Sequence, residues 1–240
     1  MIFELIEDIA TMALAVAGLY FGLGAYARRE QPAWLEPLHR RRLATLAILV
    51  LAVCAIKVSE DVLGRESGPI DSAILLFIHA HVPQALTGFF RAVTFSASST
   101  SLFPLTVVLA IALLCARRRA EALLVAASVI GAALVVYFVK IAVGRERPAL
   151  WDTDSYWGSS FPSGHTLVVA AFATAAALCV SRIRPSARRL AVSIAIAWIC
   201  LVGVSRLVLG VHWPTDVLVA ACTGAFLALA ISVGADLHKA

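Results

Sequence analysis

The chain has 240 residues, of which 61% are apolar and only 15% are charged, and its mean hydropathy is +0.90. Soluble domains contain roughly 45–50% apolar and about 25% charged residues, so the composition excludes a soluble globular domain and a disordered chain. The net charge of +5 does not indicate a nucleic-acid partner, because the charged residues gather between apolar runs, as they do in membrane proteins. The composition therefore predicts an integral membrane protein whose surroundings are the lipid bilayer.

Seven apolar segments are long enough to cross a bilayer, which requires a helix of about 20 residues. In chain order they cover about 8–27, 43–63, 92–116, 120–143, 164–181, 190–210 and 215–235. This pattern predicts the all-α fold class, as a polytopic membrane helix bundle. The first segment follows Glu4, Glu7 and Asp8 instead of a basic stretch, so we expect a retained spanning helix and not a cleaved signal peptide.

The distribution of basic residues predicts how the helices are oriented. Basic residues gather in the loops after the first, third and fifth segments and in the C-terminal tail: Arg28, Arg29, Arg40, Arg41, Arg42, Arg117, Arg118, Arg119, Arg182, Arg184, Arg188, Arg189 and Lys239. Cytoplasmic loops are enriched in Lys and Arg, so we expect an inner (plasma) membrane protein with its N-terminus outside and its C-terminus in the cytoplasm. Segment 65–91 is then external, and its apolar stretch 70–78 is expected to lie along the membrane interface.

Four basic residues on the predicted outward side break this pattern: Lys140, Arg145, Arg147 and Arg206. They belong to three short stretches that we expect to meet at the outer face. These stretches are KIAVGRERP at 140–148, FPSGH at 161–165 and SRLVLGVHWPTD at 205–216.

Cations in these stretches are typical of an anion site. Arg147 and Arg206 can each donate paired hydrogen bonds to phosphate oxygens, and Lys140 adds a compact charge. Ser163 and Gly164 begin a helix after a proline, so we expect their backbone N–H groups to be free to bind an anion. Three cations at a helix N-terminus suit a group that develops negative charge on several oxygens, which is the situation in phosphoryl transfer.

Two histidines can supply the reactive groups for such a transfer. His212 lies four residues before Asp216, close to one helical turn, and a carboxylate on one ring nitrogen would orient the other for attack on phosphorus. His165 has no carboxylate nearby in the sequence, so we expect it to protonate the leaving oxygen.

These stretches resemble the type 2 phosphatidic acid phosphatase superfamily of membrane lipid phosphatases, which shares its core with vanadium haloperoxidases. The family signature, K-x6-RP, PSGH and SR-x5-H-x3-D, is matched at every position by Lys140, Arg147, Pro148, Pro162, Ser163, Gly164, His165, Ser205, Arg206, His212 and Asp216. The resemblance implies a six-helix phosphatase core at 43–240, preceded by an extra N-terminal transmembrane helix and a basic loop at 1–42.

The same resemblance implies the roles of the site residues. His212 would form a phosphohistidine, with Asp216 as its partner and His165 as the leaving-group acid. The implied phosphate-binding residues are Lys140, Arg147, Ser163, Gly164 and Arg206. Neither a metal nor another cofactor is expected.

The substrate expectation also follows from the resemblance. The length, the short loops and the GRERP sequence most resemble bacterial phosphatases that recycle undecaprenyl diphosphate. We therefore expect a lipid phosphatase that hydrolyses an isoprenyl diphosphate at the outer face, in cell wall biogenesis. Phosphatidylglycerophosphate, phosphatidate and lipid A phosphate are the alternative substrates. A lipid transporter or flippase with an anion site is a remoter alternative, since transporters place their sites near the bilayer midplane.

Two charged residues keep alternative interpretations at this stage. Arg145 could bind a second phosphate, or it could pair with Glu146 or Asp152. Lys57 lies with Glu60 and Asp61 toward the end of its helix, where snorkelling and mutual pairing could explain all three, or it could line the substrate entrance.

Overall fold

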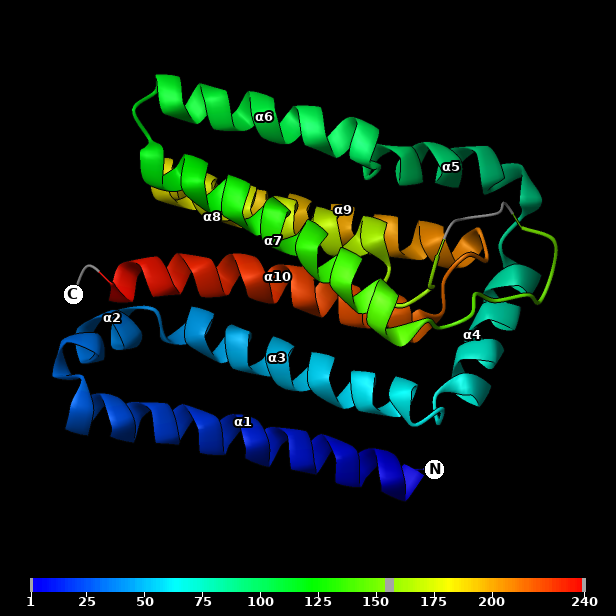
Figure 1. The fold of residues 1–240 in the computed structure, drawn as a ribbon, viewed down its shortest axis with the longest axis horizontal. Coiled ribbons are helices and arrows are strands. Elements are labelled where there is room, and N and C mark those ends of the chain that lie inside the picture. Colours follow the sequence, from blue (N-terminus) through cyan, green and yellow to red (C-terminus); the bar gives the residue numbers. More distant parts are fainter. Residues whose placement is uncertain (1, 154–157, 239–240) are drawn as a thin grey trace.

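The chain folds into a bundle of long helices (Figure 1). The computed structural model describes residues 2–153 and 158–238, and these residues form helices but no strand, as the sequence predicts. The α-helices are α1 (Ile2–Glu30), α2 (Leu35–Arg40), α3 (Arg42–Leu63), α4 (Gly68–His81), α5 (Thr87–Ser96), α6 (Ser99–Cys115), α7 (Arg119–Val143), α8 (Gly164–Ile183), α9 (Arg188–Val208) and α10 (Pro214–Leu237). Short 3-10 turns occur at Pro32–Trp34, Gln84–Leu86 and Pro185–Ala187.

Within the described ranges, six helices are long and apolar enough to cross a membrane, and a seventh span results if a bent helix pair counts as one. The six are α1, α3, α7, α8, α9 and α10, which match six of the predicted segments. The predicted segment 92–116 is instead divided into α5 and α6, because the helix breaks at Ala97 and Ser98. A hydroxyl group bonds to the helical backbone just before this break: Ser96 Oγ donates to the Val93 carbonyl oxygen at 2.6 Å.

Helix α4 lies across one end of the bundle. It meets the following helical segment, Gln84–Ser96, at an angle of 96°, and Figure 1 shows it running across the ends of the long helices. Leu75 is fully buried on its inner side, whereas Ile70 and Phe77 are exposed. α4 therefore covers this end of the bundle: it packs on the bundle through Leu75 and exposes other apolar side chains on its outer surface.

The basic segments predicted to share one side all lie at the opposite end of the bundle. This end contains the last turn of α1 with α2, the α6–α7 connection, the α8–α9 connection and the end of α10 (Figure 1). Lys239 lies outside the described residues. We refer to this end as the basic end and to the end that carries α4 as the site end. Which end faces the cytoplasm stays a prediction, as does the division of the chain at residue 42.

Helices α8 and α10 form the most extensive helix–helix contact. Gly224 of α10 packs directly on α8, where an added Cβ would overlap the Leu167 carbonyl oxygen and lie 2.7 Å from Ala170 Cβ. Small residues let helices in a membrane approach closely enough for extensive van der Waals contact. Because α8 and α10 both begin at the site end, this contact also fixes how far apart their first turns lie.

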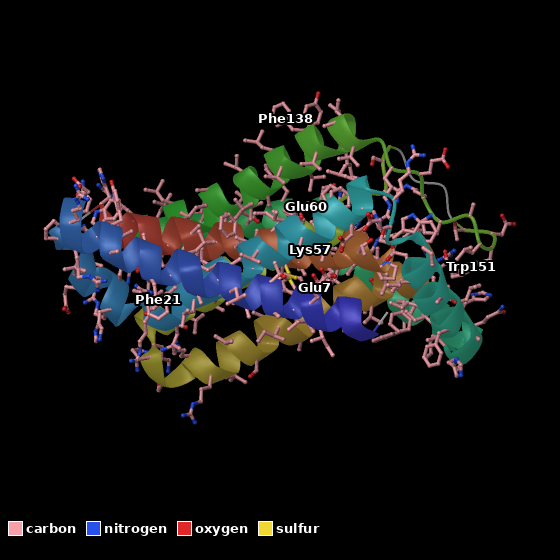
Figure 2. All side chains as sticks on the ribbon, turned by 90° about the horizontal axis from the view of Figure 1, so that it is seen from below. Glu7, Phe21, Lys57, Glu60, Phe138 and Trp151 are labelled. Atoms are coloured by element: carbon pink, nitrogen blue, oxygen red, sulfur yellow. The ribbon has the colours of Figure 1, made fainter. Side chains whose placement is uncertain are left out.

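Helix α1 packs on the outside of the bundle against α3. An ion-pair cluster joins them: Lys57 Nζ lies 3.2 Å from Asp8 Oδ1 of α1 and 3.1 Å from Asp61 Oδ1. Figure 2 shows Lys57 between α1 and α3, near Glu7 and Glu60. Ionisable residues in apolar helices are tolerated when they pair, so the structure favours the pairing interpretation of Lys57.

The exterior of the bundle is apolar. Phe21 of α1 and Phe138 of α7 are 70% and 62% exposed, and Figure 2 shows both on the outer surface. Soluble monomers rarely expose a contiguous apolar surface of this breadth. The bundle is thus suited to a lipid environment along its length.

Substitution of Gly224 tests the α8–α10 contact. We expect Gly224→Ala to lower the thermal unfolding midpoint in detergent, because the new methyl group forces the helices apart at a cost of about 1–3 kcal/mol. Gly131→Ala is the matched control, since a Cβ at Gly131 meets nothing within 4 Å. Equal midpoints for the two variants would contradict the close contact.

Candidate active site

The three sequence stretches meet at a cavity of about 370 Å³ at the site end. Six of the eight predicted site residues line it: Lys140, Arg147, Gly164, His165, Arg206 and His212. The other two, Ser163 and Asp216, are fully buried behind its wall. Residues from α7, α8, α9 and the connections between them therefore converge as the motifs predict.

Arg206 is the most deeply placed cation. It belongs to the last turn of α9 and is fully buried. Its Nη1 donates to Thr94 Oγ1 of α5 at 3.4 Å, and the same hydroxyl lies 2.7 Å from Ser205 Oγ. Thr94, which was not predicted from the sequence, holds the guanidinium from a helix outside the three motifs.

Lys140 and Arg147 are joined by one backbone carbonyl. Lys140 Nζ donates to the Ser159 oxygen, and Arg147 Nη2 donates to the same oxygen at 3.4 Å. Arg147 Nη1 also donates to the Val211 carbonyl at 2.8 Å. The connection between α7 and α8 thus brings the two cations to the same side of the cavity as the α9–α10 connection.

His212 lies between a carboxylate and a cation. Its Nδ1 is 3.5 Å from Asp216 Oδ2, and its Nε2 is 3.5 Å from Arg147 Nη1. Burial lowers the pKa of His212 to about 4; the charges of Arg206 and Arg147 act in the same direction, and Asp216 opposes them. The imidazole is therefore neutral near pH 7, which is the form that can act as a nucleophile.

The start of α8 differs in one respect from the sequence expectation. Gly164 begins the helix and lines the cavity, as expected. The Ser163 N–H donates to the Asp216 carbonyl at 3.2 Å, and Ser163 Oγ lies 3.0 Å from Thr166 Oγ1. The expectation of a free Ser163 amide is therefore wrong, because this amide ties the start of α8 to the first turn of α10.

Arg145 has neither of the partners proposed from its sequence neighbours. Its Nη1 donates to Asp216 Oδ1 at 2.6 Å, and its Nη2 donates to Asp71 Oδ2 of α4 at 2.7 Å. Asp71 was not predicted as a partner of Arg145, although a single carboxylate in the apolar sequence of α4 was a usable signal. Such a group is costly to bury without a partner.

The remaining wall of the cavity is apolar and comes mainly from α6, α7 and α8. Ser99 contributes a hydroxyl group to this wall, and the other side chains are apolar: Ala97, Leu102, Phe103, Val129, Ala133, Val136 and Val168. A cavity with cations at one end and an apolar wall at the other fits an amphiphile that carries an anionic group.

The cations make the cavity unsuited to a metal ion. Lys140, Arg147 and Arg206 would repel a cation placed beside them. In the part of the chain that the structure describes, no group of three or more His, Cys, Asp and Glu side chains is arranged to hold a metal.

Comparison with known sequences shows which protein family this chain resembles. Residues 121–237 match the model of the PAP2 superfamily. Phosphatidylglycerophosphatase B of Escherichia coli (strain K12) is 43% identical over 86 residues, which are 34% of this chain and 33% of that protein. Lipid A 1-phosphatase of Rhizobium johnstonii is 30% identical over 135 residues, which are 49% of this chain and 52% of that protein. The matches thus span between about a third and half of these relatives.

A solved structure shares the fold. It is a transmembrane PAP2 type phosphatidylglycerolphosphate phosphatase from Bacillus subtilis, with a TM-score of 0.68 at 24% identity, and the match covers 80% of this chain and 95% of that chain. The protein is accordingly a multi-pass integral membrane protein. The match to the PAP2 superfamily model, over residues 121–237, contains all three motifs.

Proposed function

We propose that the protein hydrolyses the phosphate monoester of a membrane lipid through a phosphohistidine intermediate. The observation that carries this proposal is the cavity itself, which joins three cations and two histidines to an apolar wall. A phosphate group would lie among the cations, and the lipid chain would lie along the apolar wall. The anion-carrying transporter is less well supported, because the cations lie at helix ends and not near the middle of the helices.

In the first step, His212 Nε2 attacks phosphorus while the bond from phosphorus to the lipid oxygen breaks. His165 begins with a proton and donates it to the leaving oxygen, so that the lipid leaves as an alcohol. The phosphorylated ring keeps its proton on Nδ1 and is positively charged, and Asp216 stabilises this charge. Lys140, Arg147, Arg206 and the Gly164 N–H bind the phosphate oxygens as charge builds up on them.

In the second step, water attacks the phosphohistidine. His165, now unprotonated, accepts a proton from this water, the bond from phosphorus to Nε2 breaks, and His212 returns to its neutral form. The product is inorganic phosphate, and both histidines have regained their starting protonation states. No group outside the chain and water is required for this cycle.

The substrate we propose carries a single phosphate. All three cations line one cavity, and Arg145, which could have bound a second phosphate, is held by two carboxylates. The relatives named as phosphatidylglycerophosphatase B and lipid A 1-phosphatase also favour the phosphomonoester alternatives over the isoprenyl diphosphate expected from the sequence.

We also propose that the site end faces the exterior or periplasm. The arginine clusters gather at the basic end, and such clusters are typical of the cytoplasmic side. With this orientation the N-terminus lies outside and the C-terminus inside.

Replacement of the nucleophile is the direct test of the reaction. In detergent, we expect His212→Ala to lower phosphate release from a lipid phosphate at least about 10³-fold, because no other group can form the covalent intermediate. His39→Ala, in α2 at the basic end, is the control and should retain wild-type turnover. Wild-type turnover in His212→Ala would refute the assignment.

A substrate panel tests the proposed class. We expect kcat/KM for phosphatidylglycerophosphate, phosphatidate or lipid A 1-phosphate to exceed that for an isoprenyl diphosphate at least about tenfold, because the site binds one phosphate group. Phosphate release is measured for each lipid in the same detergent. A preference for the isoprenyl diphosphate would restore the expectation from the sequence.

The apolar wall is tested by narrowing it. Ala133→Phe places a ring in the cavity, so we expect KM for a long-chain lipid phosphate to rise about tenfold or more, with little change for a short-chain, water-soluble phosphate ester. Leu134→Phe enlarges the next side chain, which is 51% exposed and is not part of the cavity wall, and it should change neither KM. Equal behaviour of the two variants would show that the lipid chain takes another path.

A further inference from the structure

A buried network connects α4 with the carboxylate beside His212. Asp71 is fully buried, and its Oδ2 accepts hydrogen bonds from Arg145 Nη2 at 2.7 Å and from Thr215 Oγ1 at 2.7 Å. Asp71 Oδ1 accepts one from the Thr215 N–H at 3.0 Å. Asp71 therefore caps the first turn of α10, the helix that carries Asp216, from a separate element of the fold.

Arg145 extends this network to the reactive side chain. Its Nη1 donates to Asp216 Oδ1 at 2.6 Å, while Asp216 Oδ2 accepts the Trp213 N–H at 2.9 Å and lies 3.5 Å from His212 Nδ1. The guanidinium carbon also lies 5.5 Å from the centre of the Trp213 ring. Each oxygen of Asp216 is thus directed, one toward Arg145 and the other toward His212.

The charges in this network depend on one another. Asp71 and Asp216 are both fully buried, and Arg145 lies between them as their shared cation. Removing one partner of a buried ion pair leaves an uncompensated charge, which is strongly unfavourable. The position of Asp216 relative to His212 is therefore set by groups that do not line the cavity.

We propose that Asp71 and Arg145 are positioning residues, which hold Asp216 so that it orients and stabilises His212 during phosphoryl transfer. This inference rests on the proposed phosphatase function. Neither residue touches the phosphate; both act through Asp216. Without Asp71, Asp216 is the one carboxylate among the described residues that still pairs with Arg145, which draws it away from His212. Without Arg145, two buried carboxylates face each other without a cation, and Asp216 shifts away.

The experiment compares Asp71→Asn, Arg145→Gln and the double variant in the full-length protein in detergent. We expect each single substitution to lower kcat roughly 10- to 100-fold while KM stays within about threefold, because binding of the phosphate is preserved but the nucleophile is misaligned. The double variant should be more active than Arg145→Gln alone, because removing both charges leaves Asp216 without an opposing carboxylate.

Two inhibitors separate positioning from a general structural role. Vanadate forms a bond to the histidine, so its inhibition constant should rise in both single variants. The constant for inorganic phosphate, which the cations and the Gly164 N–H hold without a bond to the histidine, should not change. The matched controls at the basic end are Asp236→Asn and Arg182→Gln, which remove another paired carboxylate and arginine and should leave kcat unchanged. Arg145→Lys provides a second test if Asp71→Asn does not fold, with a smaller loss of kcat and the same inhibitor pattern.

Several outcomes would overturn the inference. Wild-type kcat in Asp71→Asn or in Arg145→Lys would do so, as would a double variant that is no better than Arg145→Gln. A parallel loss of vanadate and phosphate inhibition would assign the network a structural role only. A wild-type protein that releases no phosphate from any lipid phosphate would instead refute the proposed function, and the two failures are thereby distinguished.

Discussion

The fold at the site end must accommodate the mutual repulsion of three cations. Lys140, Arg147 and Arg206 line one cavity, and like charges at close range are unfavourable wherever water is scarce. The fold offsets this repulsion with neutral oxygens: the Ser159 carbonyl accepts from two of the cations, and a threonine hydroxyl from α5 accepts from the third. These contacts hold the three cations at the cavity. In the proposed function, a phosphate dianion binds among them at positions that the fold has already set.

The packing of α8 against α10 sets the positions of the two histidines, His165 and His212. Gly224 allows the two helices to touch along their length, and the Ser163 N–H bonds the Asp216 carbonyl where both helices begin. His165 lies in the first turn of α8, and His212 lies two residues before Pro214, the first residue of α10. The separation of the two histidines therefore depends on helix packing, and in the proposed mechanism a shift of either helix would alter both proton transfer and attack.

The sequence predicted those features that depend on local pattern or on motif spacing. Long apolar runs predicted seven spans, six of which are single long helices, and the three motifs predicted six of the residues that line the cavity. The break at Ala97 and Ser98 was missed because an apolar segment continues through it. Asp71 and Thr94 were missed for a different reason, since their contacts join residues that are 144 and 111 positions apart. No local pattern records such partners, and only an isolated polar group in an apolar segment hints that a partner exists.

The two groups of basic residues in the chain have different surroundings, and this difference bears on the selectivity of the proposed phosphate site. Arginines at the basic end lie in the connections and end turns of the helices, where their charge acts on the position of the helices in the bilayer. Cations at the site end are held by the fold beside an apolar wall. In the proposed function, inorganic phosphate contacts the cations but leaves that wall unfilled, and a neutral lipid fills the wall but offers the cations no phosphate. A lipid phosphate does both at once, so the two parts of the cavity together favour this class of substrate.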